Sequence, residues 1–347
     1  MSLSFEFAGS HHPISRIVLP FHSINHALKG IGDDEFGFPT RTVVEIYGPT
    51  GIGKSTLCTT LASYVSQALG NLEIAYLDLE GQDDKIIGRV LETSGYSAEK
   101  FNWVTSPKSK GKVDVSDEAM LNALLEEFYT DPPCVGILDS VAAIASRAEV
   151  QGEIGDANMG RRAFGMAQFS RGISRALRTI EVPTALFMIN HWYEKMGTIG
   201  PAKQYTAPGG VVKENLEKLR IQVKVPWVDY ISGGDGKAEG RFDGGWIVEG
   251  KVEKNRSGAK NSIFQVFVYG GQGVHVGMSA LIDCLAAGLA EVKTGGKVVM
   301  DGQDFGTLKK IVANKKDDKD FFIPFINSLK VETIEDDTVS QDDNDAE

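Results

Sequence analysis

The stretch that most constrains this 347-residue chain is Gly48–Ser55, which reads G-P-T-G-I-G-K-S and fits the pattern G-x-x-x-x-G-K-S. It follows a run rich in β-branched residues, Val43–Tyr47, and precedes Thr56–Leu69, which alternates apolar and polar residues at helical spacing. Glycines let successive backbone N–H groups turn inward around an anion, and the following helix directs the positive end of its dipole at the same place. Strand, loop and helix together predict a phosphate-binding P-loop. The alternative is a glycine-rich turn with a surface lysine.

The P-loop pattern predicts ATP and Mg²⁺ as cofactors. Lys54 is expected to reach the β- and γ-phosphates, and the Ser55 hydroxyl is expected to ligate the metal. Asp139 ends the apolar run Cys134–Asp139, where the second acid of a P-loop ATPase orients the Mg²⁺ water shell. An aspartate that only caps a turn is the alternative for this residue. The nucleotide-binding residues that we expect are Gly48, Pro49, Thr50, Gly51, Ile52, Gly53, Lys54, Ser55, Thr56 and Asp84.

A second pair of acids ends the apolar stretch Glu73–Glu80. Asp78 and Glu80 are two residues apart and would share one face of a strand. A carboxylate at this place is able to polarise the water that attacks the γ-phosphate, as general bases do. We favour Glu80 because it lies nearer the carboxyl end of the strand, where α/β proteins bind their ligands.

Apolar patterns predict an α/β fold of the P-loop NTPase type. Strands that alternate with helices indicate a mostly parallel central sheet with helices on both faces. Later strands without long helices between them indicate antiparallel additions, and three short helices indicate a small C-terminal α/β domain. Helices are expected at His22–Leu28, Asp117–Tyr129, Asn158–Ile180, Ser279–Leu289, Asp304–Ala313 and Asp320–Leu329, and late strands at Leu219–Val225, Gly245–Val252 and Ile263–Tyr269.

Composition predicts a cytoplasmic protein with no membrane partner. Hydrophobic residues make up 42% of the chain, but no apolar run approaches the roughly 20 residues that span a bilayer. The N-terminus lacks the basic-then-apolar pattern of a signal peptide. Cys58, Cys134 and Cys284 lie far apart and fit no metal spacing, which is typical of reduced core residues. A net charge of −11 would normally argue against a nucleic-acid partner.

The basic residues are unevenly distributed, however. No acid lies between Gly160 and Ile180, and Arg171, Arg175 and Arg178 are spaced i, i+4, i+7 on one face of the predicted helix. A glycine-rich and proline-rich segment, 192–212, follows the next strand and carries aromatic and basic residues together. Charge for phosphates and flat or apolar groups for bases are what single-stranded nucleic acid binding uses. The alternative is a solvated helix face.

Two further stretches resemble the RecA family of recombinases, with its bacterial and phage (UvsX-like) branches. They are Asp139–Ala143, which reads D-S-V-A-A, and Gly152–Gly160, which reads G-E-I-G-D-A-N-M-G. Val44–Pro49, Ile189-Asn190, Gly209-Gly210 and Lys254-Asn255 match as well, so that the resemblance covers roughly residues 25–295. It implies an ATPase core at 36–272, an N-terminal oligomerisation segment at 1–35 and a small C-terminal domain at 273–330. Residues 331–347 carry eight acids and no base, which predicts a disordered acidic tail.

The resemblance implies a DNA-dependent ATPase that forms a helical filament on single-stranded DNA and exchanges strands with a homologous duplex. Mediator and single-strand-binding proteins are implied as partners, in a bacterial or phage-infected cytoplasm. Glu80 falls on the catalytic glutamate, and Lys254 and Arg256 fall on basic residues that reach the neighbouring subunit's ATP. Residues 148–160 and 192–211 fall on two DNA loops. The implied DNA-binding residues are Met159, Gly160, Arg162, Arg171, Lys195, Met196, Gly209 and Gly210.

The sequence also departs from the family pattern. His191 replaces the glutamine that senses the γ-phosphate, and an imidazole can still hydrogen-bond a phosphate oxygen, more strongly when it is protonated. Ile87 stands at the position of the adenine-stacking tyrosine. Two other functions remain open at this point. One is a ring helicase with a RecA fold, which has no reason to carry the 152–160 motif, and the other is a regulatory P-loop ATPase that binds a partner recombinase.

Overall fold

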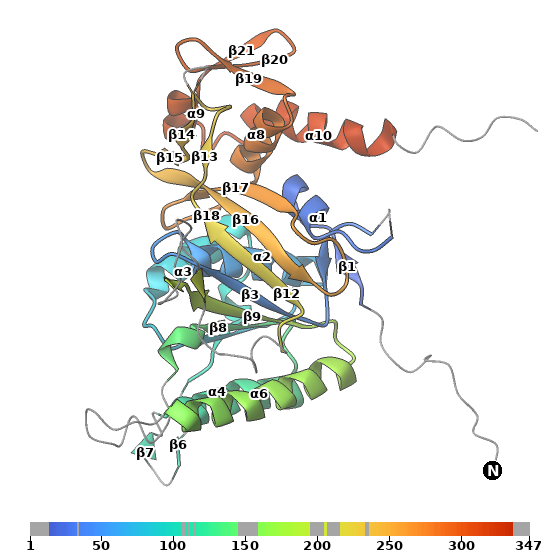
Figure 1. Cartoon of the computed structure of the whole chain (residues 1–347), viewed down its shortest axis with the longest axis vertical. Helices are drawn as coiled ribbons and strands as arrows, with labels where there is room; N and C mark the ends of the chain where they lie inside the picture. Colours follow the sequence, from blue (N-terminus) through green and yellow to red (C-terminus); the bar gives the residue numbers. More distant parts are fainter. Residues whose placement is uncertain are drawn as a thin grey trace, which may run out of the picture.

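A computed structural model describes residues 14–32, 35–105, 108–109, 112–113, 116–144, 159–194, 205–206, 216–232 and 236–335. Its centre is a ten-stranded sheet in the order β18-β17-β16-β12-β3-β9-β8-β4-β5, with β15 paired to β16 (Figure 1). The pairs from β12 to β5 are parallel, and those from β12 to β18 are antiparallel. The expected α/β fold is therefore confirmed. The strands are β3 (Thr42–Gly48), β4 (Ile74–Asp78), β5 (Phe101–Trp103), β8 (Val135–Asp139), β9 (Ala185–His191), β12 (Leu219–Lys224), β15 (Arg241–Phe242), β16 (Gly245–Asn255), β17 (Ile263–Tyr269) and β18 (Gly273–Val274).

Helices cover both faces of the parallel half of this sheet. Successive side chains of a strand point to opposite faces, and accordingly Val44 packs with one core cluster and Val43 with another. The first cluster includes residues of α2 (Lys54–Ala68) and α3 (Asp84–Ser94), and the second includes residues of α4 (Asp117–Thr130) and α6 (Met159–Thr179). Figure 1 shows α4 and α6 side by side beneath the sheet. This arrangement leaves the strand ends, and not the faces, as the place for a site.

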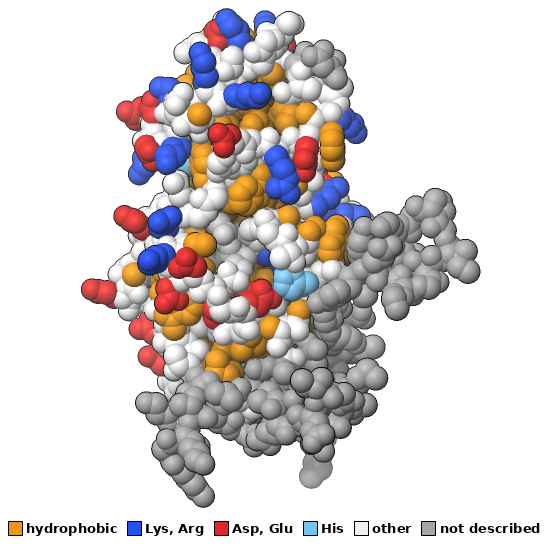
Figure 2. Space-filling view, turned by 90° about the vertical axis from the view of Figure 1, so that its left-hand side faces the viewer, with side chains coloured by type: hydrophobic (Ala, Val, Ile, Leu, Met, Phe, Trp, Pro, Cys, Tyr) orange, Lys and Arg blue, Asp and Glu red, His pale blue; other side chains and the backbone are white. Residues whose placement is uncertain are grey.

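The C-terminal domain differs in part from the expected helices. The stretch Asp304–Ala313 is not one helix, because β21 (Gln303–Thr307) precedes α9 (Leu308–Asn314). β21 completes a three-stranded sheet with β19 (Ala290–Lys293) and β20 (Lys297–Met300), whose tight turn uses glycines with positive φ at Gly295 and Gly296. Acidic and basic side chains are interspersed over the upper part of the molecule in Figure 2. The other helices are α8 (Val276–Ala286) and, after the short helix η3 (Asp320–Phe322), α10 (Ile323–Glu335), which extends five residues into the expected tail.

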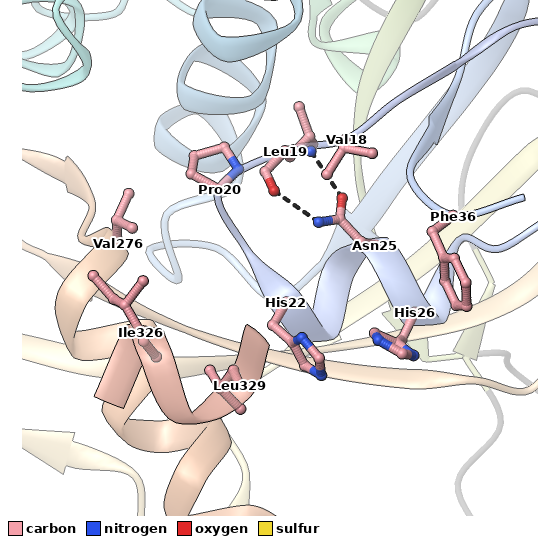
Figure 3. A pocket seen from close by; sticks show the side chains of 11 residues that line it. Val18, Leu19, Pro20, His22, Asn25, His26, Phe36, Val276, Ile326 and Leu329 are labelled. Carbon is pink, nitrogen blue, oxygen red and sulfur yellow. Dashed lines mark hydrogen bonds between the residues drawn. The ribbon is translucent and has the colours of Figure 1, made fainter. Parts of the chain in front are cut away.

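The N-terminal part packs against both the core and this domain. β1 (Arg16–Ile17) pairs with β2 (Phe38–Pro39), and α1 (His22–Ala27) contacts β17 and α8. Beside α1 lies a hollow of about 470 Å³, lined mainly by apolar side chains that include Val276, Ile326 and Leu329 (Figure 3). Asn25 forms one wall. Its side-chain Oδ1 accepts the backbone N–H of Leu19 over 2.9 Å, and its Nδ2 donates to the Leu19 carbonyl oxygen over 2.7 Å. This hollow is lined by no residue expected to contact the nucleotide, and residues 1–13 and 336–347 lie outside the described structure.

Phe187 in β9 provides a test of the core. It is fully buried and stacks on Phe38 with ring centroids 5.3 Å apart. We expect Phe187→Ala to lower the free energy of unfolding by roughly 3–5 kcal/mol, because it removes apolar contacts and leaves a cavity. Ile263→Ala, at a side chain that is 54% exposed, is the control and should change it by less than about 0.5 kcal/mol. Equal shifts of the denaturant midpoint for both variants would contradict this packing.

Candidate nucleotide site

The P-loop has the geometry that its sequence predicted. β3 ends at Gly48, and α2 begins at Lys54 after a loop in which Gly51 and Gly53 adopt φ of 75° and 87°. Residues other than glycine rarely adopt this left-handed conformation. On the sheet side, Trp246 of β16 donates from Nε1 to the carbonyl oxygen of Ile52 over 3.0 Å. The loop is thus held by a side chain of β16, two strands away from β3, just before α2 begins.

Lys54 lies folded beneath this loop. Its Nζ donates to the carbonyl oxygens of Gly48 and Pro49 over 3.2 and 2.8 Å and lies 3.4 Å from Nδ1 of His191, and the residue is only 6% exposed. Burial lowers the pKa of this ammonium, and the carboxylates of Asp139 and Glu80 act in the opposite direction. A lysine held by two carbonyl oxygens can exchange them for phosphate oxygens without crossing open solvent.

Asp139 and Ser55 form a pair of oxygen ligands suited to Mg²⁺. The Ser55 hydroxyl donates to Asp139 Oδ2 over 2.6 Å, and the Tyr76 hydroxyl donates to the same atom over 2.7 Å. The other oxygen, Oδ1, is buried and has no hydrogen-bond partner among the described residues. Burial raises the pKa of Asp139, although both hydroxyl donors act against this. A hard cation prefers such oxygen ligands, so the residues fit the metal that the sequence predicted.

Glu80 lies at the same edge, just beyond the end of β4. Its Oε1 accepts a hydrogen bond from the Ser140 hydroxyl and lies 2.7 Å from Nε2 of His191. The other ring nitrogen of His191, Nδ1, lies 3.3 Å from the Thr50 hydroxyl and 3.4 Å from Lys54 Nζ. Burial opposes ionisation of Glu80, but the hydrogen bonds from Ser140 and His191 hold the pKa of this carboxyl below its usual range. His191 therefore joins the P-loop to the predicted general base.

Asp78, the other acid of that pair, has a structural role. Its carboxylate accepts backbone N–H groups of Glu80 and Gly81 over 2.9 Å each and of Gln82 over 2.6 Å. These bonds fold the chain after β4 and turn Glu80 toward the P-loop. The alternation of side chains along a strand could not show which of the two acids faces the P-loop, because the direction of the Glu80 side chain is set by the loop after β4.

Four other residues of the sequence analysis lie elsewhere. Ile87, which stands at the position of the adenine-stacking tyrosine in the family pattern, is 2% exposed and packs within the first core cluster. Asp84 begins α3 and is exposed. Lys254 pairs in register with Arg220, which in turn is level with Glu45 at the middle of β3. Lys254 therefore lies away from Gly48, where this chain's own P-loop begins, and Arg256, just beyond the end of β16, lies further away still.

Comparison with known proteins assigns this fold and site to a family. The family model described as RecA N-terminal domain matches residues 11–234, which include every strand of the parallel half of the sheet. The chain belongs to the RecA family. Curated relatives named Protein RecA include those of Lactiplantibacillus pentosus and Streptomyces rimosus, both 30% identical, over 188 and 215 residues, and that of Bacillus subtilis, 28% identical over 195 residues. The matches cover 54%, 62% and 56% of this chain and 46%, 52% and 50% of the relatives, so the chain spans about half the length of the curated relatives that it matches.

Only part of the expected DNA surface is described. α6 begins at Met159 and includes Gly160 and Arg162 in its first turn. Arg171 is exposed on this helix, and so are Arg175 and Arg178, which follow it by four and seven positions. Lys195, Met196, Gly209 and Gly210 lie outside the described residues. In the described part of the chain, no helix is both long and apolar enough to span a bilayer.

Two contacts of the site were missed by the sequence analysis. Tyr76 lies two residues before Asp78 on β4 and reaches across to Asp139, and Ser140 follows Asp139 directly. Strand alternation would have placed Tyr76 on the face of Asp78, but the identity of its partner depends on the pairing of β4 with β8. That pairing is not a local property of either strand.

The contact between Ser140 and Glu80 predicts a pH effect. Ser140→Ala removes a hydrogen bond that favours the charged carboxylate, so the pKa of Glu80 should rise. A general base must be deprotonated, and therefore the acid limb of the pH–rate profile for ATP hydrolysis should move to higher pH. Ser232→Ala, which removes a hydroxyl that donates to the backbone carbonyl oxygens of Asp229 and Gly236, is the control and should leave the limb in place. An unchanged profile for Ser140→Ala would remove Glu80 as the titrating base.

Proposed function

We propose that this protein is an ATP-dependent DNA recombinase, which forms a helical filament on single-stranded DNA and pairs it with a homologous duplex. The observation that carries this proposal is the assembly of Lys54, Ser55, Asp139 and Glu80 at one edge of a RecA-family sheet. The exposed arginines of α6 supply positive charge on a helix that starts at the end of the first expected DNA loop. Phosphate contacts of this kind give sequence-independent affinity for DNA.

In hydrolysis, this chain's residues would act as follows. Lys54 leaves the carbonyl oxygens of Gly48 and Pro49 and binds the β- and γ-phosphates. Ser55 and Asp139 hold Mg²⁺, which when bound neutralises charge on the phosphates. Glu80 would orient the attacking water by accepting a hydrogen bond from it, once His191 Nε2 has left Glu80 for a phosphate oxygen.

The site is completed by a second subunit in this proposal. In the strand register, Lys254 is level with Arg220, and Arg220 is level with Glu45. Glu45 lies three positions before Gly48, where the P-loop begins. That corresponds to about 10 Å along the strand, in addition to the two strand spacings that separate β16 from β3. Lys254 and Arg256 are therefore badly placed for their own ATP, which supports the proposal that they act on the ATP of a neighbour in a head-to-tail assembly.

Electron microscopy with ATP and single-stranded DNA tests the function directly. We expect helical filaments that require both, and none with Lys54→Ala, which removes the lysine charge from the phosphates. A closed ring would favour a helicase, and a small oligomer that requires a partner recombinase would favour a regulator. Either result, with parent protein shown to be folded, contradicts the proposal.

Glu80→Gln separates binding from hydrolysis. The amide keeps the shape of the side chain but cannot accept a proton, so ATP hydrolysis should fall by a factor on the order of 10² to 10⁴. Nucleotide and DNA binding should persist, and filaments should last longer after dilution. The measurement pairs phosphate release with binding of a fluorescent ATP analogue. Loss of analogue binding would instead show that Glu80 is needed to shape the site.

Arg171→Ala tests the DNA surface. If Arg171 contacts a phosphate, its loss reduces the number of counterions released, and the slope of log affinity against log salt should decrease by roughly 0.7 for single-stranded DNA. Lys319→Ala, at an exposed residue before α10, is the matched control and should leave the slope unchanged. Identical slopes for the parent and Arg171→Ala would exclude this arginine from the phosphate contacts.

A further inference from the structure

A row of polar side chains crosses the strands of the central sheet, from β9 beside the nucleotide site to the antiparallel strand β16. It runs through four adjacent strands, β9, β3, β12 and β16 (Figure 1). Asn190 Nδ2 donates to Glu45 Oε1 over 2.8 Å, and Arg220 Nε lies 3.1 Å from Glu45 Oε2. In the strand register, Arg220 stands opposite Glu45 on one side and opposite Lys254 on the other. Three strand spacings of about 4.8 Å give this row a length of roughly 14 Å.

Glu217 joins the last two members of the row. It lies just before β12, and its Oε1 is 3.9 Å from Arg220 Nη1 and 3.7 Å from Lys254 Nζ. The Glu217 side chain is 1% exposed, whereas that of Lys254 is 26% exposed. Lys254 is therefore held by a buried carboxylate while its own side chain stays partly exposed at this edge.

Stability alone does not account for this cluster. Glu45, Glu217 and Glu253 surround one guanidinium, and Glu253 Oε2 lies 3.6 Å from Arg220 Nε. Burial acts to lower the pKa of Arg220, but the surrounding carboxylates keep it above its usual value. Buried ion pairs cost desolvation energy that their attraction often fails to recover, and apolar replacements are frequently as stable. A role in fixing the positions of the two ends of the row would account for a cluster that stability does not require.

Both ends of the row lead to residues of the proposed mechanism. Asn190 Oδ1 accepts the backbone N–H of His191 over 3.0 Å, and His191 contacts Glu80 and the P-loop. Lys254, at the other end, is the residue proposed to reach the neighbouring subunit's nucleotide. Each contact between these ends is a direct hydrogen bond or ion pair in a rigid sheet.

We propose that Glu217 and Arg220 are positioning residues, which fix Lys254 for the neighbouring subunit's ATP and tie it to Asn190 and His191 of their own site. This inference rests on the proposed function, because it assumes that Lys254 acts on a nucleotide in trans. A shift of His191 on binding ATP is then transmitted through Asn190, Glu45 and Arg220 to Lys254. By reciprocity, contact of Lys254 with the neighbour's phosphate alters the affinity of its own site.

A double-mutant cycle on Glu217 and Lys254 tests the first part. The quantity measured is ATP hydrolysis stimulated by single-stranded DNA, for the parent, Glu217→Gln, Lys254→Gln and the double variant. Glu217→Gln should lower the rate by a factor on the order of 10 to 10², which is what a misplacement of about 1 Å costs. It should have no further effect in the Lys254→Gln background, because residues that act through one contact are not additive.

Control variants distinguish a loss of rate caused by unfolding from one caused by misplacement of Lys254. Glu239 and Arg241 form an ion pair of 2.8 Å on the surface, and Glu239→Gln with Arg241→Gln should leave the rate unchanged. Thermal unfolding of each variant reports stability separately, and Glu217→Asp keeps the carboxylate if Glu217→Gln fails to fold. It should retain more activity than Glu217→Gln at equal stability. Additive losses, or full activity of Glu217→Gln, overturn the positioning role.

Arg220→Lys tests the link to the chain's own site. Lysine keeps the charge but lacks the planar fork with which arginine engages Glu45 and Glu217 together. We expect the dependence of hydrolysis on ATP concentration to become less cooperative, with a Hill coefficient nearer to 1. Equal Hill coefficients in the parent and the variant overturn the link. If Lys254→Gln itself hydrolyses ATP at the parent rate, Lys254 does not act on the neighbouring subunit's ATP. That result contradicts the role of Lys254 in the proposed function and not only the positioning role of Glu217 and Arg220.

Discussion

The parallel pairing of β3, β9, β8 and β4 is the constraint on which the site depends. Its register sets Gly48 opposite His191, Asp139 opposite Ile189 and Asp78 opposite Asp139. Because parallel strands end at the same edge, four short segments that are far apart in the sequence bring their polar residues together there. A slip of one residue in any pair would turn the acid of that strand to the other face and separate it from the P-loop.

Within this frame, the polar residues of the site stabilise one another. Asp139 is fully buried and remains hydrogen-bonded through donors from two different elements, Ser55 of α2 and Tyr76 of β4. A buried carboxylate without such donors would be costly. The remaining buried oxygen, Asp139 Oδ1, has no donor among the described residues, and a bound metal with its water shell would satisfy it. The two donors thus stabilise the buried carboxylate and leave one of its oxygens for the proposed cofactor.

Local signals in the sequence were sufficient for much of this arrangement. The P-loop, the strand-end Asp139 and the long amphipathic helix were predicted because each depends on residues within about twenty positions. Three features were not predictable in this way. The direction of Glu80 depends on hydrogen bonds that Asp78 makes within a loop, the burial of Ile87 depends on how α3 packs, and β21 depends on a partner strand that precedes it. Tertiary context decided each of them.

His191 shows how one substitution can alter the coupling between these parts. It stands at the end of β9, where it contacts Lys54 and Thr50 through one nitrogen and Glu80 through the other. An imidazole has only one donor when it is neutral, so it cannot donate to Glu80 and to a phosphate from the same nitrogen at once. A γ-phosphate near Lys54 competes for this ring, and its capture would release Glu80 from Nε2. Binding of the nucleotide and activation of the base would then be two consequences of one rearrangement, which the hydrogen bond from His191 to Asn190 extends toward the rest of the sheet.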